Sequence, residues 1–241
     1  MDWNKLSLRA DDILVAGFPR SGTNWTQQVV NQLIYGGQET PTDVPNMWVD
    51  RDFDFPTPAN FDRPERRVLK THLKFADVPA DKLPNKIIHV TRRWKDVLAG
   101  SFGVKVQLSE QVLMDRIPMF TASNPLGGST VENVASWRNC GLDSNRLLFI
   151  HYSQLLNDFD NTTAAIADFV GLRDSWDANG AQIRQHCAFA YMKERWKTIF
   201  PPAVAQGIQN RWQPYWNDSL EGTYQTELAK LNAQDQAWME Q

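Results

Sequence analysis

Residues 12–25 read Asp-Ile-Leu-Val-Ala-Gly-Phe-Pro-Arg-Ser-Gly-Thr-Asn-Trp and join an apolar run to a loop with two glycines. The apolar run over 12–17 is typical of a short strand that is buried on both faces of a parallel sheet. After the loop, apolar residues recur at the spacing of one helix face: Trp25, Val29, Val30, Leu33 and Ile34. Gly36 and Gly37 follow, as glycines often do at the end of a helix. The stretch therefore predicts a strand, a loop and a helix in direct succession.

Three further segments have the composition of buried strands, and helical patterns lie between them. The strands are expected at 67–72, 86–91 and 146–151. Helices are expected at about 94–106, 129–139, 153–170, 180–194 and 223–240. Strands that alternate with helices predict an α/β protein, with a three-layer, P-loop-like fold and a central parallel β-sheet flanked by helices. Because no linker or repeat interrupts this order, residues 1–241 are expected to form a single domain.

The composition excludes several classes of protein. Lys and Arg number 25 against 28 Asp and Glu, and the resulting net charge of −3 argues against a general nucleic-acid binder. Apolar residues make up 42% of the chain, which excludes a disordered protein. Cys140 and Cys187 are too few for a disulfide framework, and no apolar run approaches the roughly 18 residues that a membrane helix needs. We therefore expect a cytoplasmic protein with neither nucleic acid nor a membrane as a partner.

The loop after the first predicted strand has the glycine spacing of a phosphate-binding loop. Gly17 and Gly22 are separated by four residues, as in a Walker A loop, whose backbone amides bind phosphate at the N-terminus of a helix. A nucleotide hydrolase needs a lysine after the second glycine, but this chain has Thr23 there, and the loop's only cation is Arg20. No later strand ends in the aspartate that helps to hold Mg²⁺. The loop is therefore expected to bind an anion without a metal.

Further cations are predicted at the same edge of the sheet. Lys70 and His72 end the second strand, and Arg92 and Arg93 directly follow the third. In an open α/β sheet, ligands bind beyond the carboxyl ends of the strands. With Arg20, the sequence thus collects four Lys and Arg side chains on one edge of an acidic protein. A polyanionic nucleotide is the expected ligand.

Three sequence blocks resemble the cytosolic-type sulfotransferases. Residues 18–25, Phe-Pro-Arg-Ser-Gly-Thr-Asn-Trp, look like that family's 5′-phosphosulfate loop, usually written PKSGTTW. Residues 70–73, Lys-Thr-His-Leu, look like its KTHLP segment, and 86–97 resemble its 3′-phosphate strand, K-x-I-Y-x-x-R-N-x-K-D-V. Residues 146–152 and 189–193 match later blocks more weakly. The blocks occur in family order over most of the chain. Because the chain is shorter than typical animal members, we expect a bacterial enzyme that acts on small molecules.

The resemblance implies sulfuryl transfer from 3′-phosphoadenosine 5′-phosphosulfate (PAPS) to a hydroxyl or amine of a small-molecule acceptor, with adenosine 3′,5′-bisphosphate (PAP) as product and no metal. By position, His72 corresponds to the general base, a role that suits an imidazole at neutral pH. Lys70 and Arg20 correspond to cations that hold the sulfuryl and bridging oxygens. The other matching positions correspond to the donor site: Ser21, Gly22, Thr23 and Asn24 for the 5′-phosphate, Trp25 and Tyr152 for adenine, and Arg92 and Ser101 for the 3′-phosphate.

Two departures from the family pattern concern the cations of the loop and of the C-terminal region. Arg20 replaces a lysine and cannot donate a proton, so assistance to the leaving group is either purely electrostatic or involves Lys70. The family's C-terminal RKG-type loop has Ala205 and Gln206 where its two cations should be. Three nearby cations are candidates to replace them: Arg211, Arg195 and Lys197.

A third departure concerns the 3′-phosphate site. Counted from Arg92, the family serine falls at Gly100, and Ser101 is one residue further. Either the helix is shifted by one residue, or Arg93 takes the place of Arg92. The sequence leaves both alternatives open.

The acceptor and two rival functions also stay open. Asp50, Asp52 and Asp54 alternate in one loop, where they either recognise a cationic acceptor or are simply solvated. The rival functions are a P-loop nucleotide kinase or hydrolase and a non-catalytic nucleotide-binding protein of the same fold. The sequence does not determine the oligomeric state.

Overall fold

A computed structural model describes residues 3, 6–39, 49–50, 64–100, 108–121, 128–196, 212–229 and 232–240. Its sheet consists of β1 (Ile13–Ala16), β2 (Val68–Thr71), β3 (Lys86–Thr91) and β4 (Leu147–His151). The described strands are all parallel and lie in the order β2-β1-β3-β4. The α/β class and the four strand positions expected from the sequence are confirmed.

The register of the sheet brings the chemically important segments to one edge. Ala16 at the end of β1 pairs with Thr71 at the end of β2, and also with His89 in β3. β3 continues for two more residues, so that its last residue, Thr91, pairs with His151 at the end of β4. The loop after β1 and the residues that follow β2, β3 and β4 therefore begin at the same edge.

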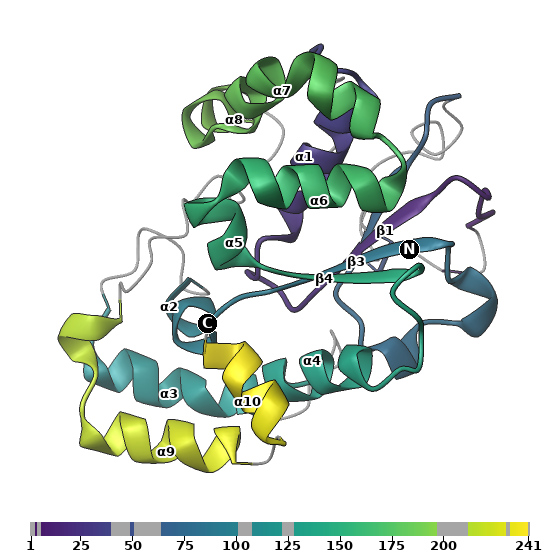
Figure 1. Cartoon of the computed structure of the whole chain (residues 1–241). Coiled ribbons are helices and arrows are strands. Elements are labelled where there is room, and N and C mark those ends of the chain that lie inside the picture. Colours follow the sequence, from purple (N-terminus) through teal and green to yellow (C-terminus); the bar gives the residue numbers. More distant parts are fainter. Residues whose placement is uncertain are drawn as a thin grey trace.

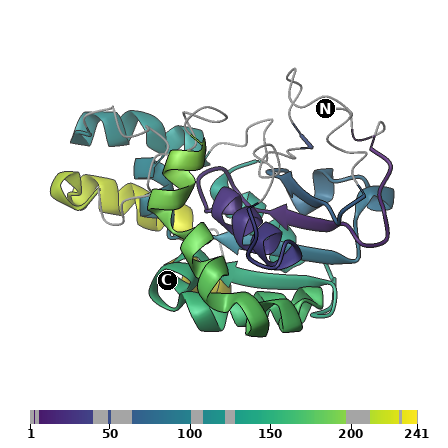
Figure 2. The ribbon, with the colours of Figure 1, turned by 90° about the horizontal axis from the view of Figure 1, so that it is seen from above.

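Helices cover both faces of the sheet (Figure 1). One layer holds α1 (Thr23–Ile34), α6 (Phe159–Val170), α7 (Arg173–Cys187) and α8 (Phe189–Trp196). The other holds α4 (Thr130–Arg138) and, next to it, α3 (Glu110–Thr121), α9 (Asp218–Leu228) and α10 (Ala233–Glu240). Two residues separate the short helix α2 (Trp94–Gly100) from the end of β3, and α5 (Tyr152–Asn157) follows β4 directly. In Figure 2, α3 and α9 extend side by side beyond the sheet.

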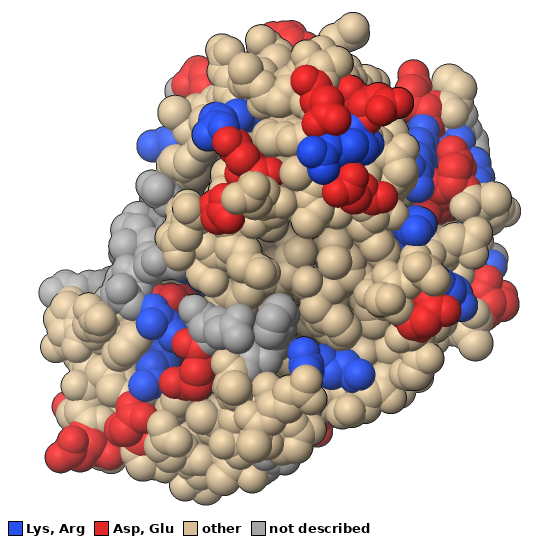
Figure 3. Space-filling view, viewed as in Figure 1, with Lys and Arg blue, Asp and Glu red and all other residues tan. Residues whose placement is uncertain are grey.

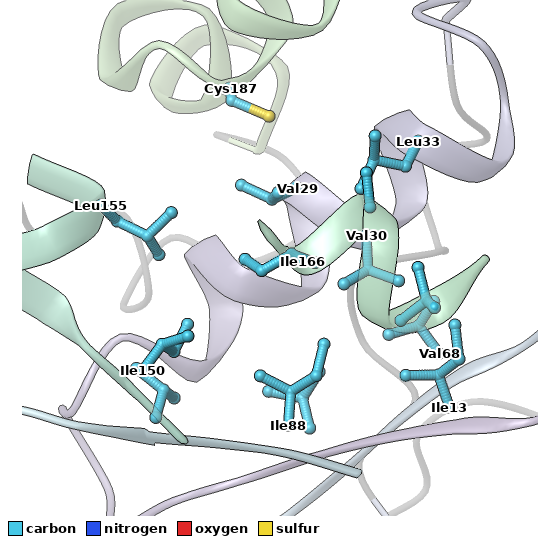
Figure 4. Packing of buried hydrophobic residues seen from close by; sticks show 14 of the residues in the cluster. Ile13, Val29, Val30, Leu33, Val68, Ile88, Ile150, Leu155, Ile166 and Cys187 are labelled. Atoms are coloured by element: carbon cyan, nitrogen blue, oxygen red, sulfur yellow. The ribbon is translucent and has the colours of Figure 1, made fainter. Parts of the chain in front are cut away.

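The strands separate the apolar residues into two clusters, one on each face. Ile13, Val15 and Ile88 face α1, α6 and α7, where Val29, Ile166 and Cys187 complete a fully buried cluster (Figure 4). The alternate residues Leu14 and Ala16 face the opposite layer and pack with the buried ring of Trp137 in α4. Burial on both faces explains why these strands are continuous apolar runs.

A third cluster lies outside the sheet and joins α2, α3, α4, α9 and α10. Its largest members are Trp94 of α2 and Tyr224 of α9, whose rings stack with centroids 4.5 Å apart. This cluster ties the C-terminal helices to the segment that directly follows Arg92.

Helix boundaries agree with the sequence where capping residues mark them. Ser129 and Glu132 form a capping box at the start of α4, and Gly171 follows the end of α6. The helix expected at 153–170 is interrupted at Asp158, between α5 and α6.

Two expected helices were wrong. The segment expected as a helix at 180–194 is two helices, because α7 begins at Arg173 and ends at Cys187, and Ala188 has extended backbone. The early turns of α7 are polar and include Gly180, so their sequence predicts a loop, and packing against α1 and α6 overrides that weak propensity. The helix expected at 223–240 is likewise two, α9 and α10. In the described part of the chain, no helix combines the length and apolar composition needed to cross a bilayer.

Candidate active site

The loop between β1 and α1 is packed tightly against the ends of β3 and β4. A Cβ atom on Gly17 would lie 2.3 Å from the carbonyl oxygen of Val90, and one on Gly22 would lie 2.6 Å from the ring of Tyr152. Gly22 also has a φ of 110°, in the left-handed region that favours glycine. Both glycines are therefore required by close approach. Directly after Gly22, α1 begins at Thr23, so its first amides lie at the loop.

Lys70 is buried at the end of β2 beside this loop. Its exposed fraction is 2%, and its ammonium donates a hydrogen bond of 2.6 Å to Oδ1 of Asn24 in the first turn of α1. A neutral amide leaves the positive charge of the ammonium in place. The contact therefore holds the buried ammonium at the loop between β1 and α1.

His72, two residues further, is held at three points. Its Nδ1 lies 2.6 Å from the carbonyl oxygen of Gly17, its backbone N–H donates to Oδ2 of Asp50, and its carbonyl accepts from Nδ2 of Asn133 at 3.0 Å. A carbonyl oxygen only accepts hydrogen bonds, so Nδ1 must carry the hydrogen. In the neutral ring, Nε2 is then the proton acceptor. This tautomer is the one that a general base needs.

Arg92 lies between the end of β3 and α2 with its guanidinium over the ring of Tyr152, at 4.3 Å from the ring centroid. It is only 4% exposed, and its buried Nε and Nη2 have no hydrogen-bond partner among the described residues. In the same part of the chain, no carboxylate forms an ion pair with it. Burial lowers the pKa of Arg92, while Tyr152 and Asp96 raise it. Two unpaired donors of a buried guanidinium are suited to an anionic ligand.

Arg20 lies close enough to Arg92 for each charge to be felt by the other. Burial lowers the pKa of Arg20, and the positive charge of Arg92 lowers it further. The backbone of Arg20 is in the left-handed region, with a φ of 73°. Its side chain runs past the end of α2, because a Cβ on Gly100 would lie 3.9 Å from Arg20 Nε. An anion between the two guanidinium groups would relieve their repulsion.

Comparisons with known proteins identify the family. The profile of the sulfotransferase domain matches residues 10–235 of this chain. The chain belongs to the sulfotransferase family. It is 24% identical to sulfotransferase 2B1 of Mus musculus, over 99% of this chain and 73% of that protein. Two solved structures share the fold: a mouse sulfotransferase, SULT7A1, complexed with PAP, and retinol dehydratase in complex with retinol and PAP. Their TM-scores are 0.73 and 0.70 at 20% identity each, covering 98% and 95% of this chain and 91% and 84% of theirs.

Trp25 of this sulfotransferase packs within the protein. Its indole N–H donates to the carbonyl of Cys187 at 2.9 Å, and its ring lies nearly parallel to that of Phe159, with centroids 6.1 Å apart. Its ring also meets that of Tyr152 edge-on at 5.4 Å. Its stacking on adenine remains a prediction.

The geometry bears on the open alternatives for the 3′-phosphate site. Arg93 forms an ion pair with Asp96 at 2.9 Å and lies over the ring of Trp212 at 5.3 Å. Arg93 is therefore engaged within the protein, and the arrangement favours Arg92 as the anion ligand. Gly100 is the last residue of α2, and Ser101 lies outside the described residues.

The candidates from the C-terminal region are mostly not tested by the structure. Arg211 and Lys197 lie outside the described residues. Arg195 pairs with the exposed Glu39, at 3.3 Å between Nη1 and Oε2. Nothing in the described part of the chain brings Arg195 to the loop.

Two further histidines, His89 and His151, are buried. His89 is fully buried between the rings of Trp137 and Phe149, and burial lowers its pKa to about 4. His151 accepts a hydrogen bond from the backbone N–H of Ser153 and so caps α5. Burial, then the charges of Arg93 and Arg92, lower its pKa to about 4. Both rings are neutral at physiological pH.

The cations of the site differ from those at the surface. On the face shown in Figure 3, basic side chains lie among acidic ones. Arg173, for example, pairs with Asp168 and Asp177, and Arg184 pairs with Asp160. Burial without a carboxylate therefore sets Arg92 apart from these surface arginines.

Two side-chain contacts to His72 were not predicted from the sequence. Asn133 of α4 holds the carbonyls of His72 and Leu73 through its Nδ2, and Asp50 accepts hydrogen bonds from Thr71 and His72. Both are far from His72 in the sequence, so no local pattern marks them. For Asp50, the one available signal was its position in an acidic loop, which suggested a different role.

Proposed function

We propose that this sulfotransferase uses PAPS as its donor and releases PAP, with His72 as the general base for a hydroxyl or amine of a small-molecule acceptor. The observation that carries the proposal is the buried guanidinium of Arg92, which has two unpaired donors beside a phosphate-binding loop. The two solved structures named above, which share this fold, are both complexes with PAP.

The donor site is inferred from the residues around the loop. The first amides of α1, with Ser21, Gly22, Thr23 and Asn24, are suited to the 5′-phosphate. Arg92 is suited to the 3′-phosphate, because its unpaired donors match phosphate oxygens. The ring of Tyr152 lies under the guanidinium of Arg92 and also packs on Gly22, so one side chain contacts both proposed phosphate sites.

His72 is proposed to take the acceptor proton at Nε2. The hydrogen bond from Nδ1 to Gly17 orients the ring and selects the tautomer, and it joins the base to the loop that would hold the donor. A fixed orientation of the His72 ring favours sulfuryl transfer, since much of the rate of such a reaction comes from the positioning of the reacting groups.

Lys70 and Arg20 are proposed to stabilise the negative charge that develops on the sulfuryl group and the leaving phosphate. Lys70 can also donate a proton, whereas Arg20 contributes charge alone. The hydrogen bond from Lys70 to Asn24 places this cation at the start of α1, next to the proposed 5′-phosphate site.

The acceptor is proposed to be a small organic molecule with a hydroxyl or amine. Retinol, which is present in the complex of retinol dehydratase, is an example of a hydroxyl compound bound by a protein of this fold. We propose that the segments 46–61 and 102–121 contact the acceptor; the structure describes 49–50 of the first and 108–121 of the second.

A thermal-shift titration tests the donor. PAP at 100 times its dissociation constant adds about 2.7 kcal/mol to the unfolding free energy, which for a chain of this size raises Tm by about 5–11 °C. ATP with and without Mg²⁺ is the comparison. A shift with Mg-ATP alone would overturn the proposal and favour a kinase or hydrolase.

Replacing the base tests the mechanism. His72→Ala is expected to bind PAP as the wild type does and to lose turnover by about a hundredfold or more. Sulfuryl transfer from PAPS is measured with 4-nitrophenol, benzyl alcohol and tyramine as acceptor probes. Wild-type turnover in this variant would remove His72 from the mechanism. PAP binding without transfer by the wild-type chain would favour a non-catalytic binding protein.

A further inference from the structure

The general base is positioned from outside its own strand. β2 ends at Thr71, so His72 lies just beyond the sheet. The bonds from its ring to Gly17 and from Asn133 to its carbonyl hold two sides of the residue. A third hydrogen bond runs from the backbone N–H of His72 to the carboxylate of Asp50.

Both carboxylate oxygens of Asp50 accept hydrogen bonds from the end of β2 and the residue after it. Oδ1 accepts a hydrogen bond of 2.6 Å from the hydroxyl of Thr71, and Oδ2 accepts from the backbone N–H of His72. The preceding residue, Val49, donates its N–H to the carbonyl of Lys70 at 2.9 Å. Residues 49–50 therefore contact each member of the run from Lys70 to His72, which contains both the proposed base and a proposed catalytic cation.

A carboxylate suits this position better than an amide. Both partners of Asp50 are donors, and an ionised carboxylate offers two acceptor oxygens. An asparagine offers one oxygen, and its NH₂ group would face either the Thr71 hydroxyl or the His72 N–H. With the oxygen on the His72 N–H, the NH₂ group would face the Thr71 hydroxyl, which already accepts from the N–H of Leu73, and the charge-assisted bond to the backbone N–H would become a weaker neutral one.

We propose that Asp50 is a positioning residue for sulfuryl transfer, which sets the backbone of His72 and thereby aims its ring. The inference rests on the proposed function, because it gives His72 the role of base. It differs from the sequence-based alternative in which Asp50 recognises a cationic acceptor, and it is supported by the hydrogen bonds that both carboxylate oxygens accept from Thr71 and His72.

The main test compares Asp50→Asn with the wild type. We expect kcat to fall about 10–100-fold, the scale of a small misplacement of a reacting group, and PAP affinity to stay within about threefold. Asp50→Glu, which keeps two acceptor oxygens, should retain more activity than Asp50→Asn. The matched control is Asp77→Asn, which removes a charge from an exposed pair with Lys74 and should change neither quantity.

A spectroscopic readout needs no acceptor. In ¹⁵N NMR of the imidazole, His72 of the wild type should carry its hydrogen on Nδ1, and Asp50→Asn should give a mixture of tautomers. If Asp50→Asn does not fold, Thr71→Val and Thr71→Ser replace it, because only the valine variant loses the hydroxyl that donates to Asp50. The valine variant should then show the loss and the serine variant should not.

Three outcomes would overturn the proposal. Asp50→Asn with unchanged kcat and unchanged tautomer would show that the contact does not position the base. A raised KM for tyramine alone, at unchanged kcat, would return Asp50 to acceptor recognition. A parallel loss of PAP affinity and kcat would show a general structural role. Full activity of His72→Ala is a separate result: it removes the proposed base itself.

Discussion

Arg92 and Lys95 lie three residues apart in the same segment, and both are almost completely buried, with exposed fractions of 4% and 8%. Their surroundings are opposite. Lys95 forms an ion pair of 2.7 Å with Glu221 and lies within 5.0 Å of the ring centroids of Trp212, Trp216 and Tyr224. Arg92 lies over one ring, Tyr152, and in the described part of the chain no carboxylate pairs with it.

The groups that contact the ammonium of Lys95, one carboxylate and three aromatic rings, all favour its positive charge. Its partner Glu221 also accepts hydrogen bonds from Trp216 and Gln225. Burial acts to raise the pKa of Glu221, but these hydrogen bonds and the one from Lys95 outweigh burial and lower it. Carboxylate and aromatic faces together compensate a buried ammonium. Lys95 therefore fastens α9 to α2.

The surroundings of Arg92 lack such compensation. Burying a charge is costly unless it is paired, and the nearby charge of Arg20 adds repulsion. The comparison teaches that a buried cation is evidence for a ligand only when the protein itself does not complete its environment.

The largest expected effect is on Arg92. Arg92→Gln should weaken PAP binding by about a hundredfold or more, because a buried charge pair to phosphate is lost. Binding of adenosine 5′-phosphate should change little, and the unfolding free energy should stay the same or rise, since repulsion with Arg20 is removed. Calorimetry with both nucleotides and denaturant unfolding measure this. Arg173→Gln, at an exposed ion pair, is the control. Equal losses for both nucleotides would contradict the 3′-phosphate assignment.

Replacing Lys95 should instead lower the stability of the fold. Lys95→Met keeps most of the side-chain volume but removes the charge, and we expect a loss of about 2 kcal/mol in unfolding free energy, a decrease in Tm of about 4–8 °C. The loss is smaller than for a fully buried pair, because the side chain of Glu221 is 37% exposed. Denaturant unfolding of the single variants and of Lys95→Met with Glu221→Gln measures the coupling.

A surface pair provides the control for Lys95. Lys74 and Asp77 lie 3.7 Å apart at the surface, and Lys74→Met should cost less than about 0.5 kcal/mol. If Lys95→Met is no more destabilising than Lys74→Met, the aromatic and carboxylate surroundings of Lys95 do not stabilise the fold.

The smallest expected effect is a change in the pKa of His151. Burial lowers this pKa to about 4, and the charges of Arg93 and Arg92 contribute. A phosphate bound at Arg92 would oppose that contribution, so PAP should raise the pKa of His151. His89 is the internal control, because its pKa of about 4 arises from burial, opposed by Asn133, and from Arg138 rather than from Arg92. NMR titration of both rings, with and without PAP, measures the change. An equal shift of both would point to a general change in the protein.

The parts of the fold that the sequence predicted are those with strong local signals. The strands ending at Ala16 and Thr91 are apolar runs, and α4 begins at a capping box. The wrong helices are those whose local signal is weak, as in the polar first half of α7 around Gly180. The same rule holds at the site, where Gly22, Lys70 and His72 belong to contiguous motifs, whereas Asp50 and Asn133 act on His72 from distant segments.

The sequence by itself determined the order of strands and helices, the glycine loop between β1 and α1, and the cations at the ends of β2 and β3, because each follows from neighbouring residues. Only the tertiary structure decided which cations are left for a ligand. Arg93 has the carboxylate of Asp96 only three residues further on, but the carboxylate that pairs with Lys95 belongs to Glu221 of α9, 126 residues away, and no such partner reaches Arg92 in the described part of the chain. Whether a buried charge is compensated depends on groups brought together across the whole chain, and no local pattern contains that information.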